Sequence, residues 1–248
     1  MSTLSTGGYC LPPAHELCHE DAWLPPSKGR RCTTLVRLPR NQSYACPPGH
    51  VPADAYVLDA LAVVLKPPAL TAVSSSRIYP SLSLLDLGAG VGQVGHALLS
   101  RGDFNYRGCD AAGNVVEATN GFLSFCDLTM PISLPRAHWV LSLECGEHIP
   151  HSGEATFVRN LHAHNLCGII LSWAALGQPG LNHINNHGSD YLLDLFSPLG
   201  YAKDEVLTRL LREGGAPNAV PGKTVGWLRR TVLALRRLHT SEECLSLR

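Results

Sequence analysis

The sequence has no excess of charge of either sign and no apolar run long enough to span a bilayer. Its 20 lysines and arginines balance 20 aspartates and glutamates, so the formal net charge at pH 7 is zero. A neutral chain gives no support to attraction of the whole molecule to nucleic acid or to an anionic membrane. No stretch approaches the roughly 18 apolar residues of a membrane-spanning helix. We therefore expect neither a membrane nor a nucleic acid as a partner.

A secretory signal is also missing. The first fifteen residues contain neither a basic region nor an apolar core of the kind that signal peptides have. We therefore expect a cytoplasmic protein, whose nine cysteines are reduced thiols rather than a disulfide framework.

Residues 1–50 differ in character from the rest of the chain. They hold four of the nine cysteines, several prolines and little periodicity. These cysteines follow one another at spacings of 8, 14 and 14 residues, without the close C-x2-C pair that structural zinc sites usually have. We expect an irregular extension that covers the domain or the mouth of its substrate site. The zinc alternative would use Cys10, His15, Cys18, His19, Cys32 and Cys46.

Residues 51–240 have the pattern of one α/β domain, followed by a short tail at 241–248. Strand patterns alternate with helix patterns, which indicates a parallel sheet with helices on both faces. The expected strands are Ser83–Leu87, Asn105–Cys109, Phe122–Cys126, Trp139–Leu143, Gly168–Trp173 and Thr224–Leu235. The expected helices are 53–65, Val94–Ser100, Val115–Ala118, Ala155–His164, Asp190–Phe196 and Glu205–Arg212.

The first of these strands runs into a glycine turn, Gly88-Ala89-Gly90-Val91-Gly92, after which helical spacing resumes. A strand, a glycine turn and a helix bring backbone close to a ligand and point helix N–H groups at it. The turn therefore predicts a nucleotide-like cofactor. Gly90 to Gly95 also satisfies G-x-G-x-x-G, so a nicotinamide dinucleotide is one alternative.

The longer run Leu84-Leu85-Asp86-Leu87-Gly88-Ala89-Gly90-Val91-Gly92 resembles the first motif of class I S-adenosylmethionine-dependent methyltransferases. The resemblance implies a Rossmann-like, doubly wound and mostly parallel sheet of seven strands. It implies that Asp86 helps to position the cationic end of the cofactor, directly or through water, whereas this carboxylate would repel a diphosphate. Otherwise Asp86 is a capping or solvent-facing residue.

Three further motifs of this family follow in order along the chain. The resemblance implies that Asp110 binds the ribose, beside Ala111, and that Asp127 binds the adenine amino group while Leu128 covers the ring. It places Glu144 near the methionine end. An isolated aspartate in a loop is otherwise an ordinary turn residue. The full expected cofactor set is Asp86, Gly88, Ala89, Gly90, Gly92, Asp110, Ala111, Asp127, Leu128 and Glu144.

The stretch Glu144-Cys145-Gly146-Glu147-His148-Ile149-Pro150 resembles an E-x-x-E-H-x-P signature of a small-molecule branch of the family. Ubiquinone-pathway O-methyltransferases carry a related pattern whose two acids and histidine can hold a divalent cation. If Glu144 opens a helical turn, Glu147 and His148 fall on its face. We predict a base or substrate contact for His148 and no resident metal. A metal site and a purely structural role are the alternatives.

The loop after the fifth strand is polar and contains His183 between amides. It resembles the corresponding loop of a set of methyltransferase-domain proteins, which makes His183 a second candidate base; the alternative is a surface turn. No D/N-P-P-Y/F/W motif follows the fourth strand, which disfavours exocyclic-amine substrates. The sequence thus predicts in-line methyl transfer from S-adenosylmethionine to an O, N, S or C nucleophile of a small molecule or side chain. An NAD(P)-dependent oxidoreductase and a non-catalytic partner module are the rival functions.

Overall fold

The computed structural model describes residues 35–37, 43–45, 53–65, 82–102, 104–180, 182–217, 219–220, 222, 224–239 and 244. The zinc candidates Cys10, His15, Cys18, His19, Cys32 and Cys46 lie outside these residues. Two short strands within 1–50, β1 (Leu35–Arg37) and β2 (Ser43–Ala45), pair antiparallel. The N-terminal extension was expected to be irregular, and this pair is ordered structure that the sequence did not predict.

The domain is built on a seven-stranded sheet with the strand order β5-β4-β3-β6-β7-β9-β8. Five strands are parallel to their neighbours, and β9 runs antiparallel between β7 and β8. The strands are β3 (Ser83–Leu87), β4 (Asn105–Asp110), β5 (Ser124–Phe125), β6 (Ala137–Leu143), β7 (Asn165–Ser172), β8 (Tyr201–Lys203) and β9 (Leu233–Arg237). The expected doubly wound α/β fold is therefore confirmed.

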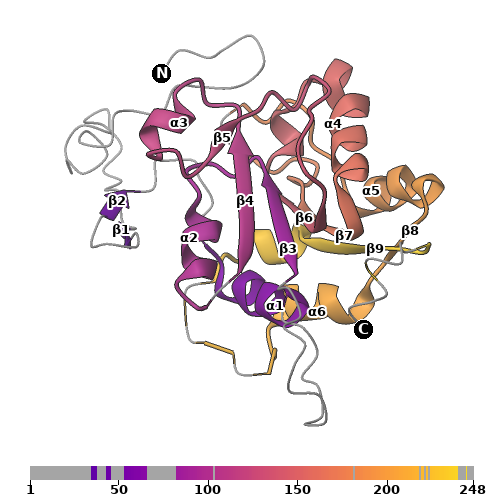
Figure 1. Ribbon diagram of the computed structural model, residues 1–248. Coiled ribbons are helices and arrows are strands. Elements are labelled where there is room, and N and C mark those ends of the chain that lie inside the picture. Colours follow the sequence, from indigo (N-terminus) through magenta and orange to yellow (C-terminus); the bar gives the residue numbers. More distant parts are fainter. Residues whose placement is uncertain are drawn as a thin grey trace.

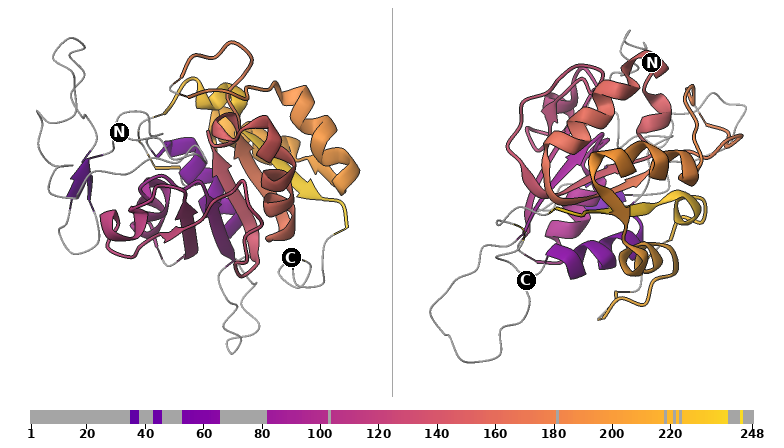
Figure 2. Two further views of the ribbon diagram at one scale, coloured as in Figure 1. Left: turned by 90° about the horizontal axis from the view of Figure 1, so that it is seen from above. Right: turned by 90° about the vertical axis from the view of Figure 1, so that its right-hand side faces the viewer.

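Helices cover both faces of this sheet (Figures 1 and 2). Buried side chains of α1, α2, α6 and α7 form one core cluster, and those of α4 and α5 form a second. Strand residues alternate between the two clusters: Leu84 belongs to the first and Leu85 to the second. The helices are α1 (Ala55–Leu65), α2 (Gln93–Leu99), α3 (Val115–Ala118), α4 (His151–Ala163), α5 (Ser189–Phe196), α6 (Glu205–Glu213) and α7 (Leu228–Thr231), with 3-10 turns η1 (Gly146–His148) and η2 (Ser197–Leu199).

The C-terminal end of the sheet differs from the expectation. The single strand predicted over Thr224–Leu235 is wrong, because Leu228–Thr231 is the helix α7 and the strand β9 begins only at Leu233. Strand β8 was not predicted, since three residues are too few to show an alternating pattern. Antiparallel pairing with β9 fixes it at the sheet edge.

Four cysteines are paired, which contradicts the expectation of reduced thiols for them. Cys109 bonds to Cys126, and Cys167 bonds to Cys244. The first pair follows from the sheet, because β4 and β5 are neighbours and the Cys126 N–H donates to the Asp110 carbonyl, which leaves the two Cα atoms 5.6 Å apart. Cys145 is the free cysteine among the residues that the structure describes. Within the same residues, no helix combines the length and apolar character that crossing a membrane requires.

Candidate functional site

The glycine turn lies at the carboxyl end of β3, as the sequence predicts. Gly88, Gly90 and Gly92 have φ values of 83°, 62° and 81°, a region that residues with a Cβ rarely adopt. A Cβ on Gly88 would also come within 2.5 Å of the Cys145 Sγ. The N–H groups of Gly88 and Ala89 both donate to the Cys109 carbonyl, at 3.0 and 2.9 Å. These bonds fasten the turn to the end of the neighbouring strand.

Asp110 ends that neighbouring strand and lies against the turn. Its Oδ2 accepts the Gly90 N–H at 2.8 Å and its Oδ1 accepts the Ala112 N–H at 2.9 Å. Burial raises the pKa of Asp110 to about 6, although these backbone donors act in the opposite direction. Each carboxylate oxygen has a second lone pair, so the group can still accept hydrogen bonds from a ligand. Ala111, beside it, is half-buried.

Asp86 lies inside the sheet behind the turn and is only 3% exposed. Its Oδ2 accepts a hydrogen bond of 2.9 Å from the Tyr106 hydroxyl. Burial raises the pKa of Asp86 to about 7, and the nearby Asp110 carboxylate contributes to the rise. Asp86 is therefore buried and hydrogen-bonded rather than solvent-facing. Its partner Tyr106 was not predicted, because a tyrosine in a strand carries no signal of such a role.

Asp127 and Leu128 follow β5. The Asp127 Oδ1 accepts the Thr129 N–H at 2.9 Å and the Thr129 hydroxyl at 2.6 Å. This is the turn that the sequence left open as an alternative, and an adenine contact of Asp127 stays a prediction. Leu128 is buried in the second core cluster.

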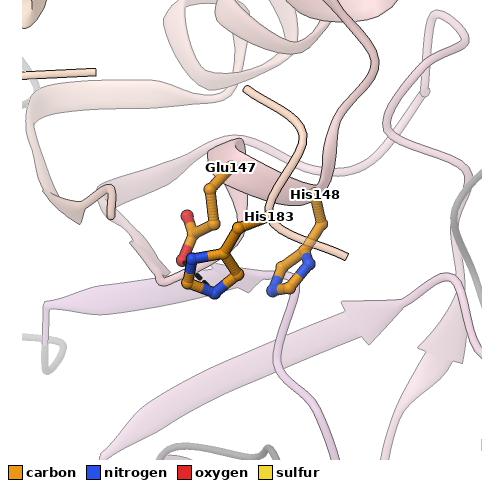
Figure 3. A group of neighbouring side chains, drawn as sticks. All are labelled: Glu147, His148 and His183. Atoms are coloured by element: carbon orange, nitrogen blue, oxygen red, sulfur yellow. Dashed lines mark ion pairs between the residues drawn. The ribbon is translucent and has the colours of Figure 1, made fainter. Parts of the chain in front are cut away.

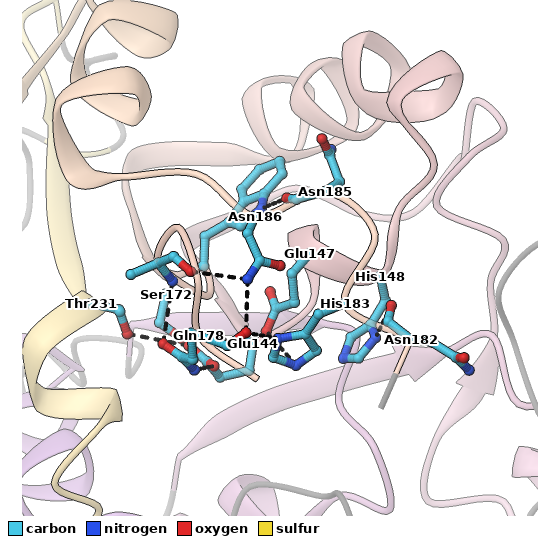
Figure 4. A network of polar contacts seen from close by, with 12 residues as sticks. Glu144, Glu147, His148, Ser172, Gln178, Asn182, His183, Asn185, Asn186 and Thr231 are labelled. Carbon is cyan, nitrogen blue, oxygen red and sulfur yellow. Dashed lines mark hydrogen bonds and ion pairs between the residues drawn. The ribbon is translucent and has the colours of Figure 1, made fainter. Parts of the chain in front are cut away.

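Glu144 follows β6 directly and has a left-handed backbone, with φ 49°. This conformation costs free energy in residues other than glycine, and it persists where the surrounding structure fixes it. Here the Glu144 N–H donates to the Ser172 Oγ at 2.9 Å, while its carboxylate accepts from Gln178 Nε2 at 3.0 Å and Thr231 Oγ1 at 3.2 Å (Figure 4). Three separate segments thus hold Glu144: the end of β7, the loop after it, and α7.

Glu147 lies in the turn η1 and is completely buried. Neither carboxylate oxygen forms a hydrogen bond of normal geometry with a described residue, although the Ala174 N–H and the Glu144 carboxylate lie close to it. Burial raises the pKa of Glu147 to about 9, and the neighbouring Glu144 carboxylate adds to this rise. The condition considered for the sequence, that Glu144 opens a helical turn, is not met, because η1 begins only at Gly146. Glu144 and Glu147 are consequently not presented on one helical face.

His148 and His183 come together although 34 residues separate them in the chain (Figure 3). Their ring centroids are 5.1 Å apart, with an angle of 82° between the planes. The His183 Nε2 is 4.0 Å from the Glu147 Oε1. Burial lowers the pKa of His148, and the neighbouring His183 lowers it further. The structure thus groups both predicted histidines with Glu147.

The loop that carries His183 is fastened to η1 and to β7. The N–H groups of Ile184 and Asn185 donate to the Glu147 carbonyl at 2.9 and 3.0 Å. The Trp173 indole N–H donates to the Asn185 carbonyl at 2.5 Å. The His183 ring packs on Gly180, where a Cβ would come within 1.9 Å of the His183 Nε2. The loop is therefore held against η1 and the end of β7, and a functional role for it stays a prediction.

A second polar group lies next to this loop and was not predicted from the sequence. Glu154 of α4 accepts hydrogen bonds from Asn185 Nδ2 at 2.8 Å and from the Tyr191 hydroxyl, and its Oε2 is 3.1 Å from the His187 Nε2. Tyr191 stacks on His187 at 3.7 Å. The only signal for this group in the sequence was the unusual density of asparagine and histidine between positions 182 and 187.

Comparison with known proteins gives a likeness of fold. No family model and no curated protein matches the chain. Among solved structures, it is similar to magnesium protoporphyrin IX methyltransferase from Synechocystis with bound S-adenosylmethionine, at 18% identity and TM-score 0.45, over 64% of this chain and 71% of the other. A TehB-like methyltransferase from Corynebacterium glutamicum gives 14% identity, TM-score 0.47 and coverages of 76% and 88%. The 1,6-didemethyltoxoflavin-N1-methyltransferase from Burkholderia thailandensis gives 15% identity, TM-score 0.45 and coverages of 75% and 79%.

The strand order itself decides the fold. When the strands β3 to β9 are renumbered 1 to 7 in chain order, their order across the sheet is 3-2-1-4-5-7-6, and the seventh strand is antiparallel. The chain has the class I methyltransferase fold. In this methyltransferase fold the four strands β3, β4, β6 and β7 are parallel, so their carboxyl ends meet at one edge of the sheet, where ligands of open α/β sheets bind.

That edge has two halves. We call the turn after β3 and the ends of β4 and β5 the turn half; it contains Asp86, Asp110 and Asp127. We call η1 and the loop after β7 the loop half; it contains Glu147, His148 and His183. Glu144, at the end of β6, lies between them.

Proposed function

We propose that this protein is an S-adenosylmethionine-dependent methyltransferase that acts on a small molecule or an accessible side chain. The observation that carries the proposal is the bond between Asp110 and Gly90, which fixes a carboxylate beside a turn of three left-handed glycines. A ribose diol is well recognised by a carboxylate, through charge-assisted hydrogen bonds. The glycines leave room for a ligand to approach the backbone closely.

The charge of the site favours a cationic cofactor over a diphosphate. Asp86 and Asp110 lie close enough for the charge of one to raise the pKa of the other. Two carboxylates beside the turn would repel the phosphates of a dinucleotide, whereas they would attract the ammonium and sulfonium groups of S-adenosylmethionine. The charge of the site therefore favours a methyltransferase over the oxidoreductase that G-x-G-x-x-G allows.

Each expected cofactor residue has a role in this proposal. Asp110 and Ala111 would hold the ribose, Asp127 and Leu128 the adenine, and Asp86 and Glu144 the methionine end. Gly88, Ala89, Gly90 and Gly92 would bring backbone to the ligand. When bound, S-adenosylmethionine supplies an electrophilic methyl group on a positively charged sulfur.

The loop half would handle the acceptor. Methyl transfer is an in-line displacement, so the protein must align the acceptor and, for a hydroxyl or an acidic nitrogen, remove its proton. His148 and His183 are the residues placed for that task. The lowered pKa of His148 keeps its imidazole neutral near pH 7, which a proton acceptor requires.

The proposed setting is a cytoplasmic enzyme with no membrane or nucleic-acid partner, in line with its zero net charge. The bonded pairs Cys109–Cys126 and Cys167–Cys244 argue against that compartment, where thiols are kept reduced.

Methyl transfer can be tested with a donor whose methyl group is isotopically labelled and a fractionated small-molecule extract. We expect at least one metabolite to gain one labelled methyl group with wild-type protein, together with stoichiometric S-adenosylhomocysteine. The Asp110→Ala variant serves as the control that should lose the reaction. Absence of labelled product and of S-adenosylhomocysteine across all fractions would contradict the proposed activity.

A further inference from the structure

We propose that Glu147, His148 and His183 bind a divalent transition-metal cation. The three side chains each offer one ligand atom, and these atoms all lie within 4.8 Å of one another. A tetrahedral ion with bonds of about 2.1 Å holds its ligand atoms about 3.4 Å apart, so small side-chain rotations would close this cluster around an ion. Figure 3 shows the two imidazole rings side by side, with the Glu147 carboxylate next to His183.

The burial of Glu147 is the first argument for a ligand. Its side chain is 0% exposed, and neither carboxylate oxygen forms a hydrogen bond of normal geometry with a described residue, although the Ala174 N–H and the Glu144 carboxylate lie close to it. Buried carboxyl groups are normally paired or hydrogen-bonded, because desolvation without compensation is costly. The His183 Nε2 lies 4.0 Å from the Glu147 Oε1, which is too far for a hydrogen bond. A cation between these groups would supply the missing partner.

The orientation of the two histidines is the second argument. The His148 Nδ1 lies 3.2 Å from the Asn182 carbonyl, and the His183 Nδ1 lies 3.3 Å from the Gln178 carbonyl. A carbonyl oxygen only accepts, so each contact requires a proton on Nδ1 and leaves the Nε2 lone pair available. Metal-binding histidines typically donate their second ring N–H in this way, which fixes the tautomer and the ring.

A neighbouring cluster shows what a satisfied carboxylate of the same kind looks like. His151, Glu154 and His187 also lie within 4.8 Å of one another. However, Glu154 already accepts hydrogen bonds from Asn185 and Tyr191, and His151 is a surface residue with an 81% exposed side chain. Glu154 needs no further partner, so the metal assignment applies to the Glu147 cluster alone.

The donor set narrows the cation. Two imidazole nitrogens and one carboxylate suit zinc, cobalt, nickel, iron or manganese, whereas magnesium and calcium prefer oxygen ligands. Three protein ligands leave at least one coordination position open, which is the arrangement of catalytic rather than structural zinc sites.

The role of the open position rests on the proposed function. A hydroxyl or thiol acceptor bound there would lose its proton at lower pH, because the cation stabilises the anion. The histidines would then promote deprotonation through the cation that they hold. Cation binding itself does not depend on methyl transfer.

Titration calorimetry of zinc chloride and cobalt chloride into chelator-treated full-length protein tests the site. We expect the wild-type protein to bind one equivalent of cation tightly. His183→Ala and Glu147→Gln should each lower the affinity at least about 100-fold, since even losing a residue that only supports a ligand lowers it 10- to 100-fold. Gly180→Ala should weaken binding as well, because it displaces the His183 ring without removing it. His151→Ala and His187→Ala are the matched controls and should bind like wild type.

Two results would overturn the assignment: no binding of either cation, or zinc affinity and stoichiometry unchanged in His148→Ala, His183→Ala and Glu147→Gln. Zinc held by cysteines elsewhere in the chain would persist in all of these variants and so counts as the second result. Binding of S-adenosylhomocysteine is measured on the same metal-free samples. It reports that each variant is folded, and its loss in wild type would contradict the proposed function without touching the metal site.

Discussion

The two halves of the sheet edge both bury acidic side chains, but they differ in the hydrogen bonds that these side chains form. In the turn half, Asp110 accepts backbone N–H groups and Asp86 accepts the Tyr106 hydroxyl. In the loop half, Glu147 is buried, and neither of its oxygens forms a hydrogen bond of normal geometry with a residue that the structure describes. The first arrangement is complete without a ligand and presents backbone and carboxylate to one. The second is incomplete, which is why it points to a cation.

A second buried glutamate, Glu154 of α4, lies next to the loop half and does have hydrogen-bond partners. Glu154 lies seven residues after Glu147 and is nearly as buried, yet Tyr191, Asn185 and His187 all contact its carboxylate. Burial alone therefore does not mark a functional acid. Hydrogen bonding distinguishes the two glutamates. Glu154 has several partners and holds the loop in place, whereas Glu147 is the one proposed to bind a ligand.

Replacing these two glutamates should give the largest contrast. Glu154→Ala would leave the buried Asn185 amide and the Tyr191 hydroxyl without their acceptor, and we expect the free energy of unfolding to fall by about 2–4 kcal/mol. Burial raises the pKa of Glu147 to about 9, so Glu147→Gln replaces a neutral carboxyl group with a neutral amide of the same shape, and metal-free protein should change by less than about 1 kcal/mol. Chemical denaturation of both variants measures the difference. Equal losses would remove the distinction between the two acids.

Cofactor affinity should separate the two halves next. Asp110→Ala removes a charged acceptor, and we expect the dissociation constant of S-adenosylhomocysteine to rise by about 10- to 150-fold, equivalent to about 1.5–3 kcal/mol. Glu147→Gln should leave this constant within about twofold, because Glu147 belongs to the loop half. Calorimetry on metal-free samples gives both values. A comparable loss in the two variants would mean that one ligand spans both halves.

The pH dependence of cofactor binding should show the smallest effect. The pKa of Asp86 is about 7 in the protein, and a cationic ligand favours its ionised form. Affinity for S-adenosylmethionine is thus present above about pH 7 and is lost as the pH falls through that value. We expect binding to be about tenfold weaker at pH 6 than at pH 8, since the ionised fraction falls about tenfold per unit below the pKa.

Asp86→Asn is the control for this experiment. It removes the titrating group and should flatten the profile above pH 6.5, while the Asp110 carboxyl still titrates around its own pKa of about 6. An unchanged profile in Asp86→Asn would assign the pH dependence to another group, such as the amino group of the ligand.

The turn half was predictable because its signals are local. The strand Ser83–Leu87 has the predicted bounds, and the three glycines take the left-handed conformations that their spacing suggests. Asp110 could be placed beside them because strands that follow one another through a helix tend to be parallel neighbours. What the sequence could not show is that Tyr106 would reach Asp86, since this contact depends on how the two strands align.

The loop half was predicted only in its parts. His148 and His183 were each candidates, but nothing in the sequence joins residues 35 positions apart into one cluster. The position of His183 depends on the hydrogen bonds from Ile184 and Asn185 to the Glu147 carbonyl, and these bonds form only in the folded loop. Likewise, the pairing of Cys109 with Cys126 follows from sheet order, and the three residues of β8 gain their strand conformation only from β9.

Calorimetry of the wild-type protein with S-adenosylhomocysteine and with NADH shows which cofactor the glycine turn binds. We predict one S-adenosylhomocysteine per chain with a dissociation constant below about 1 mM, an affinity that a site built for this cofactor should exceed, and no measurable heat from NADH. Binding of NADH without S-adenosylhomocysteine would assign the glycine turn to a dinucleotide and contradict the account.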